Sequence, residues 1–167
     1  IEILNRCIKT KQKYFCLCRP RRFGKSVTAQ MLCSYYSRGE DSSSQFDSLK
    51  IAKSTSYKKH LNQYNVIFIN MSLEFNSARH DVNQMISSVT SSIVKELKEA
   101  YPQVVFNSPD KLYESLDDVF SDSKVPFVFI VDEWDRIMRE KKEDAQSLKQ
   151  YLEWLEGIFK DQAYIAL

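Results

Sequence analysis

Glycine, proline and histidine are scarce in this sequence. Its 167 residues include three glycines, four prolines and two histidines. Low-complexity and disordered chains are enriched in glycine and proline, so their scarcity excludes those classes. His60 and His80 are isolated and have no plausible nucleophile partner, so serine- or cysteine-type hydrolysis has no support. The chain also lacks a signal peptide and any run of about 18 apolar residues, and we expect neither secretion nor membrane spanning.

The cysteines are too few and too unevenly spaced for a disulfide framework or a zinc site. The four are Cys7, Cys16, Cys18 and Cys33. Cys16 and Cys18 lie in an apolar run, and no second pair or neighbouring histidine completes a zinc set. We therefore expect buried or semi-buried thiols in a reducing, cytoplasmic compartment.

Acidic residues are nearly absent from the first part of the chain. The net charge is +2, yet residues 1–25 contain eight Lys and Arg and one acid, Glu2, a net +7 that leaves −5 for the remainder. Such a concentration of positive charge is suited to a polyanionic ligand. Lys9, Lys11 and Lys13 are more simply explained as a solvated basic face.

Apolar runs alternate with segments of helical periodicity. The runs predict β-strands at 14–18, 65–71, 125–131 and 163–167. The second and third are continuously apolar, as in parallel strands covered on both faces. Helices are predicted from Lys25 to a left-handed stop at Gly39, over 81–100, from Ser108-Pro109 onwards and near 144–160, with a short helix at 55–62. This alternation predicts an α/β fold with three layers, in which helices flank a parallel sheet.

The segment RPRRFGKS, residues 19–26, ends like a phosphate-binding loop. In the pattern G-x-x-x-x-G-K-[ST], backbone N–H groups surround the phosphates, the lysine reaches the β- and γ-oxygens, and the hydroxyl binds Mg²⁺. Lys25 and Ser26 match the last two positions, and Gly24 lets the backbone approach a phosphate closely. The N–H groups of Lys25, Ser26 and Val27 open the following helix, whose N-terminus attracts anions.

Arg19 stands where the loop pattern has its first glycine. That glycine serves mainly the turn off the strand, and a residue before proline is extended, so Arg19-Pro20 changes the entry of the loop more than its phosphate-binding part. Arg21 and Arg22 either extend positive charge toward the phosphates or are solvated. The expected nucleotide-binding residues are Arg21, Arg22, Phe23, Gly24, Lys25, Ser26 and Val27.

The run VPFVFIVDEWD, residues 125–135, ends an apolar strand in two acids. In a parallel sheet the carboxyl ends of the strands share one edge, so Asp132 and Ser26 are expected to converge on one Mg²⁺, Asp132 through water. Glu133 is expected to orient or deprotonate the attacking water. The simpler alternative is a strand that ends in solvated acids. Arg136 fits a surface ion pair better than a charge-stabilising finger.

With RPRRFGKS and VDEWD in view, the chain resembles the predicted AAA-ATPase-like family of bacteria and archaea. Its members carry TRPRRFGKS, with arginine at the position of Arg19, and a later LIDEYD. SQFDSLKI and YKKHLNQYNVIFIN are similar to further family segments, with Ser48 and Asn65 replacing a glycine and a proline. The resemblance covers essentially the whole chain.

The resemblance implies a P-loop ATPase core that uses ATP and Mg²⁺, with Lys25 and Glu133 as catalytic residues and a fourth strand inserted between the first and the third. We expect residues 1–167 to be the N-terminal part of such a domain, truncated at that strand, in a longer protein. Family members often continue into a nuclease-like domain. The expected partners are therefore nucleotide, a second copy in a homo-oligomer and nucleic acid through that further domain, with no membrane.

Two functions follow from these motifs. The first is Mg²⁺-dependent binding and hydrolysis of ATP. The alternative is a regulatory switch that binds ATP with negligible turnover and controls an appended domain or a partner.

Overall fold

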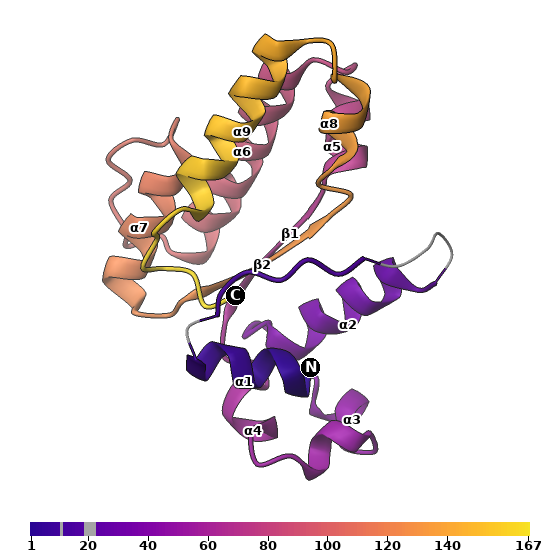
Figure 1. Cartoon of the computed structure of the whole chain (residues 1–167). Helices are drawn as coiled ribbons and strands as arrows, with labels where there is room; N and C mark the ends of the chain where they lie inside the picture. Colours follow the sequence, from indigo (N-terminus) through magenta and orange to yellow (C-terminus); the bar gives the residue numbers. More distant parts are fainter. Residues whose placement is uncertain (11, 19–22) are drawn as a thin grey trace. The chain divides into compact units, whose positions relative to one another are not determined.

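The computed structural model describes residues 1–10, 12–18 and 23–167 (Figure 1). The chain divides into two compact units. Unit 1 comprises Ile1–Phe68, Val125–Ile130 and Ile165–Leu167, and unit 2 comprises Ile69–Lys124 and Val131–Tyr164.

The helices of unit 1 are mostly short. They are α1 (Glu2–Thr10), α2 (Lys25–Tyr36), α3 (Ser43–Phe46), the 3₁₀ helix η1 (Lys50–Lys53) and α4 (Tyr57–His60). The sequence pattern did not predict α1. It predicted the start of α2 and an end before Gly39 correctly, but Gly39 does not have the predicted left-handed conformation. The helix ends at Tyr36, and Ser37 is extended (φ −63°, ψ 129°). The reason is a parallel bridge between Ser37 and Tyr64, which takes the backbone groups that would have continued the helix.

A parallel pair of strands forms the sheet. β1 (Asn65–Asn70) and β2 (Phe127–Asp132) are hydrogen-bonded neighbours, close to the predicted ranges. The predicted strand at 163–167 contributes a parallel bridge between Ile165 and Phe127, and the N–H of Ala166 donates to the carbonyl oxygen of Phe127 at 2.8 Å. The structure is thus a mixed α/β fold in which helices flank a two-stranded parallel sheet. This sheet has fewer strands than predicted, and the three-layer arrangement stays a prediction.

Residues 14–18 form no strand, although all five are described. Tyr14, Phe15 and Leu17 are 60%, 46% and 56% exposed. A strand exists through hydrogen bonds to a neighbour, which an apolar run cannot supply to itself. The expectation of buried thiols is also wrong here, because Cys16 and Cys18 are exposed; Cys7 is buried and Cys33 half-buried, as predicted.

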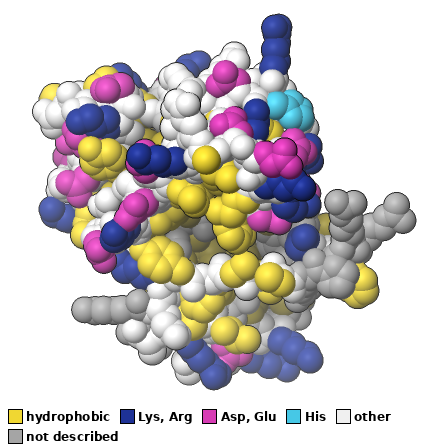
Figure 2. All heavy atoms as spheres, turned by 45° about the horizontal axis from the view of Figure 1, so that its top comes forward, with side chains coloured by type: hydrophobic (Ala, Val, Ile, Leu, Met, Phe, Trp, Pro, Cys, Tyr) yellow, Lys and Arg dark blue, Asp and Glu magenta, His cyan; other side chains and the backbone are white. Residues whose placement is uncertain are grey.

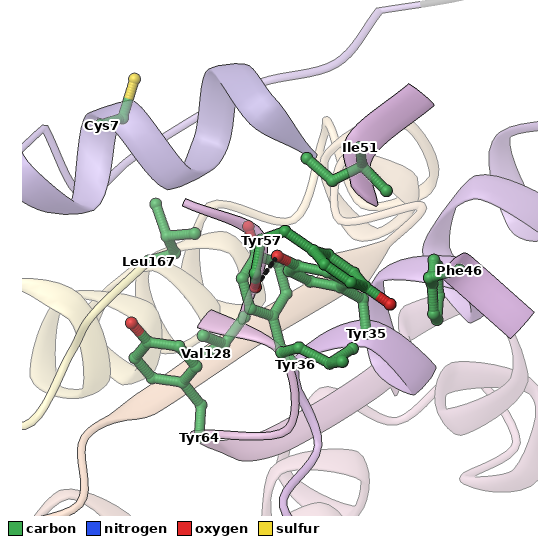
Figure 3. Packing of buried hydrophobic residues seen from close by; sticks show 10 residues of the cluster. Cys7, Tyr35, Tyr36, Phe46, Ile51, Tyr57, Tyr64, Val128 and Leu167 are labelled. Carbon is green, nitrogen blue, oxygen red and sulfur yellow. Dashed lines mark hydrogen bonds between the residues drawn. The ribbon is translucent and has the colours of Figure 1, made fainter. Parts of the chain in front are cut away.

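Tyrosine rings fill the core of unit 1 (Figure 3). Tyr35 packs edge-to-face on Tyr36 and on Phe46, with ring centroids 4.9 and 5.3 Å apart, and Tyr36 does the same with Tyr64 at 5.6 Å. This geometry places the positive edge of one ring on the negative face of the next. The cluster also includes Cys7, Ile51, Tyr57, Leu61, Val128 and Leu167.

The phenol groups of this core are hydrogen-bonded to a buried asparagine from α1. The Oδ1 of Asn5 accepts from the Tyr36 hydroxyl at 2.8 Å, and its Nδ2 donates to the Tyr35 hydroxyl at 3.0 Å. The Tyr35 hydroxyl donates in turn to the backbone oxygen of Tyr57 at 2.8 Å. Buried polar groups destabilise a fold unless they are paired, so this network makes a polar core tolerable.

Unit 2 consists mainly of helices, together with the last residues of the two strands. Its helices are α5 (Met71–Ser77), α6 (Val82–Ala100), α7 (Leu112–Ser123), α8 (Arg136–Glu140) and α9 (Ala145–Phe159), and α6 contacts α5, α7 and α9 (Figure 1). Asp81 caps α6 by accepting from the N–H of Gln84 at 2.8 Å, and Asp144 caps α9 in the same way. No helix that the structure describes is both long enough and apolar enough to span a membrane.

The helices predicted over 81–100 and near 144–160 are confirmed, and the apolar stripes that their helical periodicity implies are largely buried. The α6 stripe is buried at Val82, Met85, Val89 and Leu97. The α7 stripe is buried at Leu112, Leu116 and Val119, but α7 begins at Leu112, so the predicted start at Ser108-Pro109 is wrong. Those residues lie before the helix in a turn, in which the N–H of Lys111 donates to the oxygen of Ser108 at 3.0 Å. In α9, Leu152 is 47% exposed rather than buried.

Candidate functional site

Gly24 begins α2 in a left-handed conformation. Its φ of 71° and ψ of 24° lie where side chains with a Cβ are strained, so glycine suits this position. A Cβ built there meets no atom within 4 Å, so among the described residues the demand is conformational rather than steric. The N–H and the hydroxyl of Thr28 both donate to the Gly24 oxygen at 2.9 Å, which closes the first turn.

The first turn of α2 is exposed, whereas its last turn is anchored in the core. Lys25 is half-buried, Ser26 is exposed, and Phe23 and Val27 are 66% and 69% exposed. Gly24 has no side chain with which to cap the N–H groups of this turn. Because Tyr35 and Tyr36 are fully buried at the other end, the core holds α2 while its N-terminal turn faces solvent. Such a turn attracts an anion.

The loop entry lies outside the described residues. These are Arg19, Pro20, Arg21 and Arg22. Their role in the approach to the phosphates therefore stays a prediction.

The two acids lie at the end of β2 as predicted. Asp132 is the last residue of the strand, and Glu133 turns left-handed with a φ of 53°. The N–H of Glu133 donates to the Oδ1 of Asp132 at 3.0 Å, and the N–H of Arg136 donates to the Glu133 oxygen at 2.9 Å. Asp132 is half-buried and Glu133 is exposed. The tight turn thus ends the strand at Asp132 and places Glu133 at the surface.

A buried tyrosine of α9 supports this acidic turn, and the sequence pattern identified it only as a core residue. The hydroxyl of Tyr151, a fully buried residue, donates to the backbone oxygen of Trp134 at 2.7 Å. Burial raises the pKa of the Tyr151 phenol, and the nearby Asp135 carboxylate raises it further. The phenol therefore stays a donor at neutral pH. Its place in a helical stripe gave no signal of this contact.

Arg136 is bound within unit 2. Its guanidinium forms an ion pair with Glu140 on the same short helix, and its Nη1 donates to the Ser72 hydroxyl of α5 at 3.2 Å. The other carboxylate oxygen of Glu140 lies 3.0 Å from the Nδ1 of His80. Figure 2 shows an exposed histidine among acidic and basic side chains on one face. These contacts favour the structural role of Arg136 over that of a charge-stabilising finger.

The lysine–serine turn and the acidic turn belong to different units. Lys25 and Ser26 are in unit 1, and Asp132 and Glu133 are in unit 2. Their convergence on one ion therefore stays a prediction. Among the residues that the structure describes, no group of three or more His, Cys, Asp and Glu side chains gathers as a metal site. A phosphate-loop site binds its Mg²⁺ through one hydroxyl of the loop and one carboxylate from a separate strand, and does not need such a group.

A family model described as predicted AAA-ATPase matches residues 4–164. The chain belongs to this family. The match extends over both turns, from within α1 to the segment that follows α9. No curated protein and no solved structure matches the chain. Membership of this family indicates nucleotide binding and ATP hydrolysis in general terms, without a specific biological role.

Proposed function

We propose that this AAA-ATPase-like chain binds ATP with Mg²⁺ and hydrolyses it. The observation that carries the proposal is the first turn of α2, in which a left-handed Gly24 presents Lys25 and Ser26 on an exposed helix N-terminus. A GKS sequence at this position in a family of predicted ATPases is the pattern of a triphosphate site.

The donor set fits Mg²⁺, which prefers oxygen ligands and keeps several waters. The exposed Ser26 and the half-buried Asp132 are the residues that would hold it, through a hydroxyl and a carboxylate. When bound, the ion neutralises charge on the β- and γ-phosphates. Lys25 and the backbone N–H groups of the turn bind the phosphate oxygens. Glu133 orients the attacking water or accepts its proton.

The second candidate is a nucleotide-gated switch. It is favoured by the division of the residues, because those that bind phosphate lie in unit 1 and the proposed general base lies in unit 2. A protein built in this way retains nucleotide in unit 1 even when Glu133 is not engaged. Its bound state, rather than its turnover, then controls an appended domain or a partner.

Binding is tested with Lys25→Ala. Loss of a charge-assisted contact to phosphate is expected to weaken ATP affinity by about tenfold or more, measured by calorimetry with Mg²⁺ present. The matched control is Lys59→Ala, an exposed lysine of the same unit, which is expected to bind as the unmodified protein does. Equal affinity of all three proteins would reject both candidates.

Turnover is tested with Glu133→Gln in the full-length protein. ATP affinity is expected to be kept, whereas phosphate release falls by about 10²–10⁴-fold, because a general base is lost. Glu143→Gln changes an exposed glutamate of the same unit and is the control. If the unmodified protein binds ATP but releases no phosphate above background, with or without DNA, the switch replaces the ATPase.

A further inference from the structure

Two of the four thiols lie together on the exposed segment that precedes the phosphate loop. The Sγ atoms of Cys16 and Cys18 are 3.7 Å apart, and both residues are exposed. The other two thiols differ from this pair: Cys7 is buried with its Sγ 3.7 Å from the Gln12 Oε1, and burial raises the pKa of the Cys33 thiol. Only the first pair combines proximity with access to solvent among the four.

The geometry of this pair permits an internal bridge. Disulfides require Cα atoms within about 7 Å, a separation near that of two residues with one between them in an extended chain. The intervening Leu17 is 56% exposed, so the core does not hold it. Residues 14–18 are not part of the sheet. A bend at Leu17 therefore brings the sulfurs together without breaking a strand ladder.

The sequence on both sides of the pair is basic. No acid occurs between Glu2 and Glu40, whereas nine Lys and Arg lie in that interval, among them Lys13 and Arg19. The thiolate is the nucleophile toward oxidants, and access to solvent lets an oxidant reach it. Exposed disulfides are also the readily reduced ones, as a reversible site requires.

We propose that Cys16 and Cys18 form a redox-active dithiol that peroxide-class oxidants convert into an internal disulfide. One thiolate attacks the O–O bond of the peroxide, which forms an S–O bond and releases water or an alcohol. The second thiol attacks the resulting sulfenic acid, so that an S–S bond forms, the S–O bond breaks and water leaves. The dithiol loses two electrons and two protons, and the peroxide is reduced.

The bridge has a consequence for nucleotide binding, which rests on the proposed function. Segment 12–18 runs directly into the loop that ends in Gly24-Lys25-Ser26. Closing the disulfide shortens the separation of the two sulfurs from 3.7 Å to about 2 Å and restricts the backbone between positions 16 and 18. We expect the oxidised protein to bind ATP several-fold more weakly than the reduced protein.

The site is tested by thiol mapping after treatment with hydrogen peroxide. Free thiols are blocked with N-ethylmaleimide and the chain is digested with trypsin, which cleaves after Lys13 and Arg21 because the Arg19–Pro20 bond resists it. One peptide, Tyr14–Arg21, then carries both cysteines. The expected product is this peptide without label and two hydrogens lighter, which takes two labels after reduction.

Variants separate this pairing from others. In Cys16→Ser and Cys18→Ser the unlabelled peptide is expected to disappear, and the remaining sulfenic acid is trapped by dimedone. The double variant Cys7→Ser/Cys33→Ser is the matched control and keeps the bridge. Phenylarsine oxide, which binds two adjacent thiols, is expected to block labelling of the peptide in the reduced protein and to lose this effect in either single variant.

Two results would overturn the proposal. One is a doubly labelled Tyr14–Arg21 peptide at peroxide levels that already oxidise Cys7 or Cys33. The other is a disulfide that joins Cys16 or Cys18 to a different peptide or a second chain. Circular dichroism of the serine variants confirms that they fold.

The coupling to nucleotide is measured separately, as ATP affinity of the reduced, oxidised and re-reduced protein. Re-reduction is expected to restore the affinity, and Cys16→Ser is expected to be insensitive to peroxide. If the reduced protein binds no ATP, the proposed function fails while the dithiol chemistry stands. If the bridge forms and the affinity does not change, the dithiol stands and its link to the loop is rejected.

Discussion

The cores of the two units are built from different kinds of side chain. In unit 1, buried tyrosines pack edge-to-face, and their hydroxyls bond to Asn5 and to backbone groups 22 to 31 residues away in sequence. In unit 2, the core between helices is mainly aliphatic, with Met85, Leu116, Val119 and Ile137 fully buried. The first core depends on hydrogen-bond geometry as well as volume, and the second chiefly on volume.

This difference predicts which changes lower the stability of each unit. An aliphatic core loses stability in proportion to the cavity that a truncation creates. A polar-lined core also loses stability when a hydroxyl is left without its partner or when it ionises. Substitutions and pH therefore distinguish the two units, and the expected effects below run from the largest to the smallest.

The largest effect is expected from a cavity in unit 2. Leu116→Ala removes a fully buried side chain of α7 and is expected to lower the free energy of unfolding by about 2–5 kcal/mol. Urea denaturation measures the loss, and hydrogen exchange is expected to locate it in α6, α7 and α9. The control Leu152→Ala, at an exposed position, is expected to cost about 0.5 kcal/mol or less. An equal loss of hydrogen-exchange protection in the tyrosine core of unit 1 would contradict the expected difference between the two units.

Alkaline pH is expected to act on the buried tyrosines, most of which lie in unit 1. Burial raises the pKa of Tyr64 from 10.0 to about 12, and the pKa of Tyr57 reaches about 12 through burial and the Asp47 carboxylate. The unfolded chain therefore releases these protons first, so stability is complete below pH 10 and falls between pH 10 and 12. For Tyr64 alone the loss is on the order of 2 kcal/mol.

The phenolate ultraviolet absorbance and the unfolding free energy, followed together with pH, measure this effect. Tyr64→Phe is the control, because it removes the ionising group and is expected to flatten the pH profile. A profile that is the same in both proteins would contradict the expectation.

A smaller effect is expected from the buried asparagine of unit 1. Asn5→Ala leaves the Tyr36 hydroxyl without its 2.8 Å acceptor and is expected to cost about 1–3 kcal/mol. Tyr36→Phe in the same background is expected to recover part of the loss, because the unpaired hydroxyl is gone. A double-mutant cycle in urea measures this coupling, with the exposed Asn83→Ala as control. Strictly additive effects would show that the hydroxyl does not depend on Asn5.

The smallest and most diagnostic pair concerns two glycines. Gly24→Ala forces a Cβ into a left-handed φ of 71° and is expected to destabilise by about 1–2 kcal/mol. Gly157→Ala lies inside α9, where the nearest atom to a new Cβ is the Cδ1 of Tyr113 at 3.7 Å. It is expected to stabilise by about 0.5–1 kcal/mol. Thermal unfolding of both variants checks the opposite signs, and two shifts of the same sign would refute the conformational role of Gly24.

The sequence pattern predicted unit 2 better than unit 1 for the same physical reason. The stripes of α6 and α7 repeat every three or four residues, so a local window contains the information. In unit 1 the short helix predicted at 55–62 is confirmed by α4. The helix α3 and the 3₁₀ helix η1, each four residues long, were not predicted, because they depend on contacts with residues far away in sequence. At residues 14–18 a strand was predicted that does not form. Their composition is that of a strand, but strand formation requires a hydrogen-bonded neighbour.

The candidate site likewise combines contiguous motifs, which the sequence pattern predicted, with contacts between distant residues, which it did not. Lys25, Ser26, Asp132 and Glu133 are recognisable because each motif is contiguous, and the structure puts them at a helix start and a strand end as expected. The supports of the acidic turn are not contiguous. Tyr151 reaches Trp134 from a different helix, and Ser72 reaches Arg136 across 64 residues of sequence. No spacing rule connects such pairs.

The chain by itself determined what is local: the glycine before α2, the acids that follow β2 and the helical stripes of unit 2, because backbone preference and periodicity act over a few residues. Only the tertiary structure decided what depends on distant neighbours. It ended α2 at Tyr36 through Tyr64, joined Asn5 to the tyrosine core and left Cys16 and Cys18 exposed side by side. Hydrogen bonds and burial are satisfied in space, where residues that are remote in sequence become neighbours.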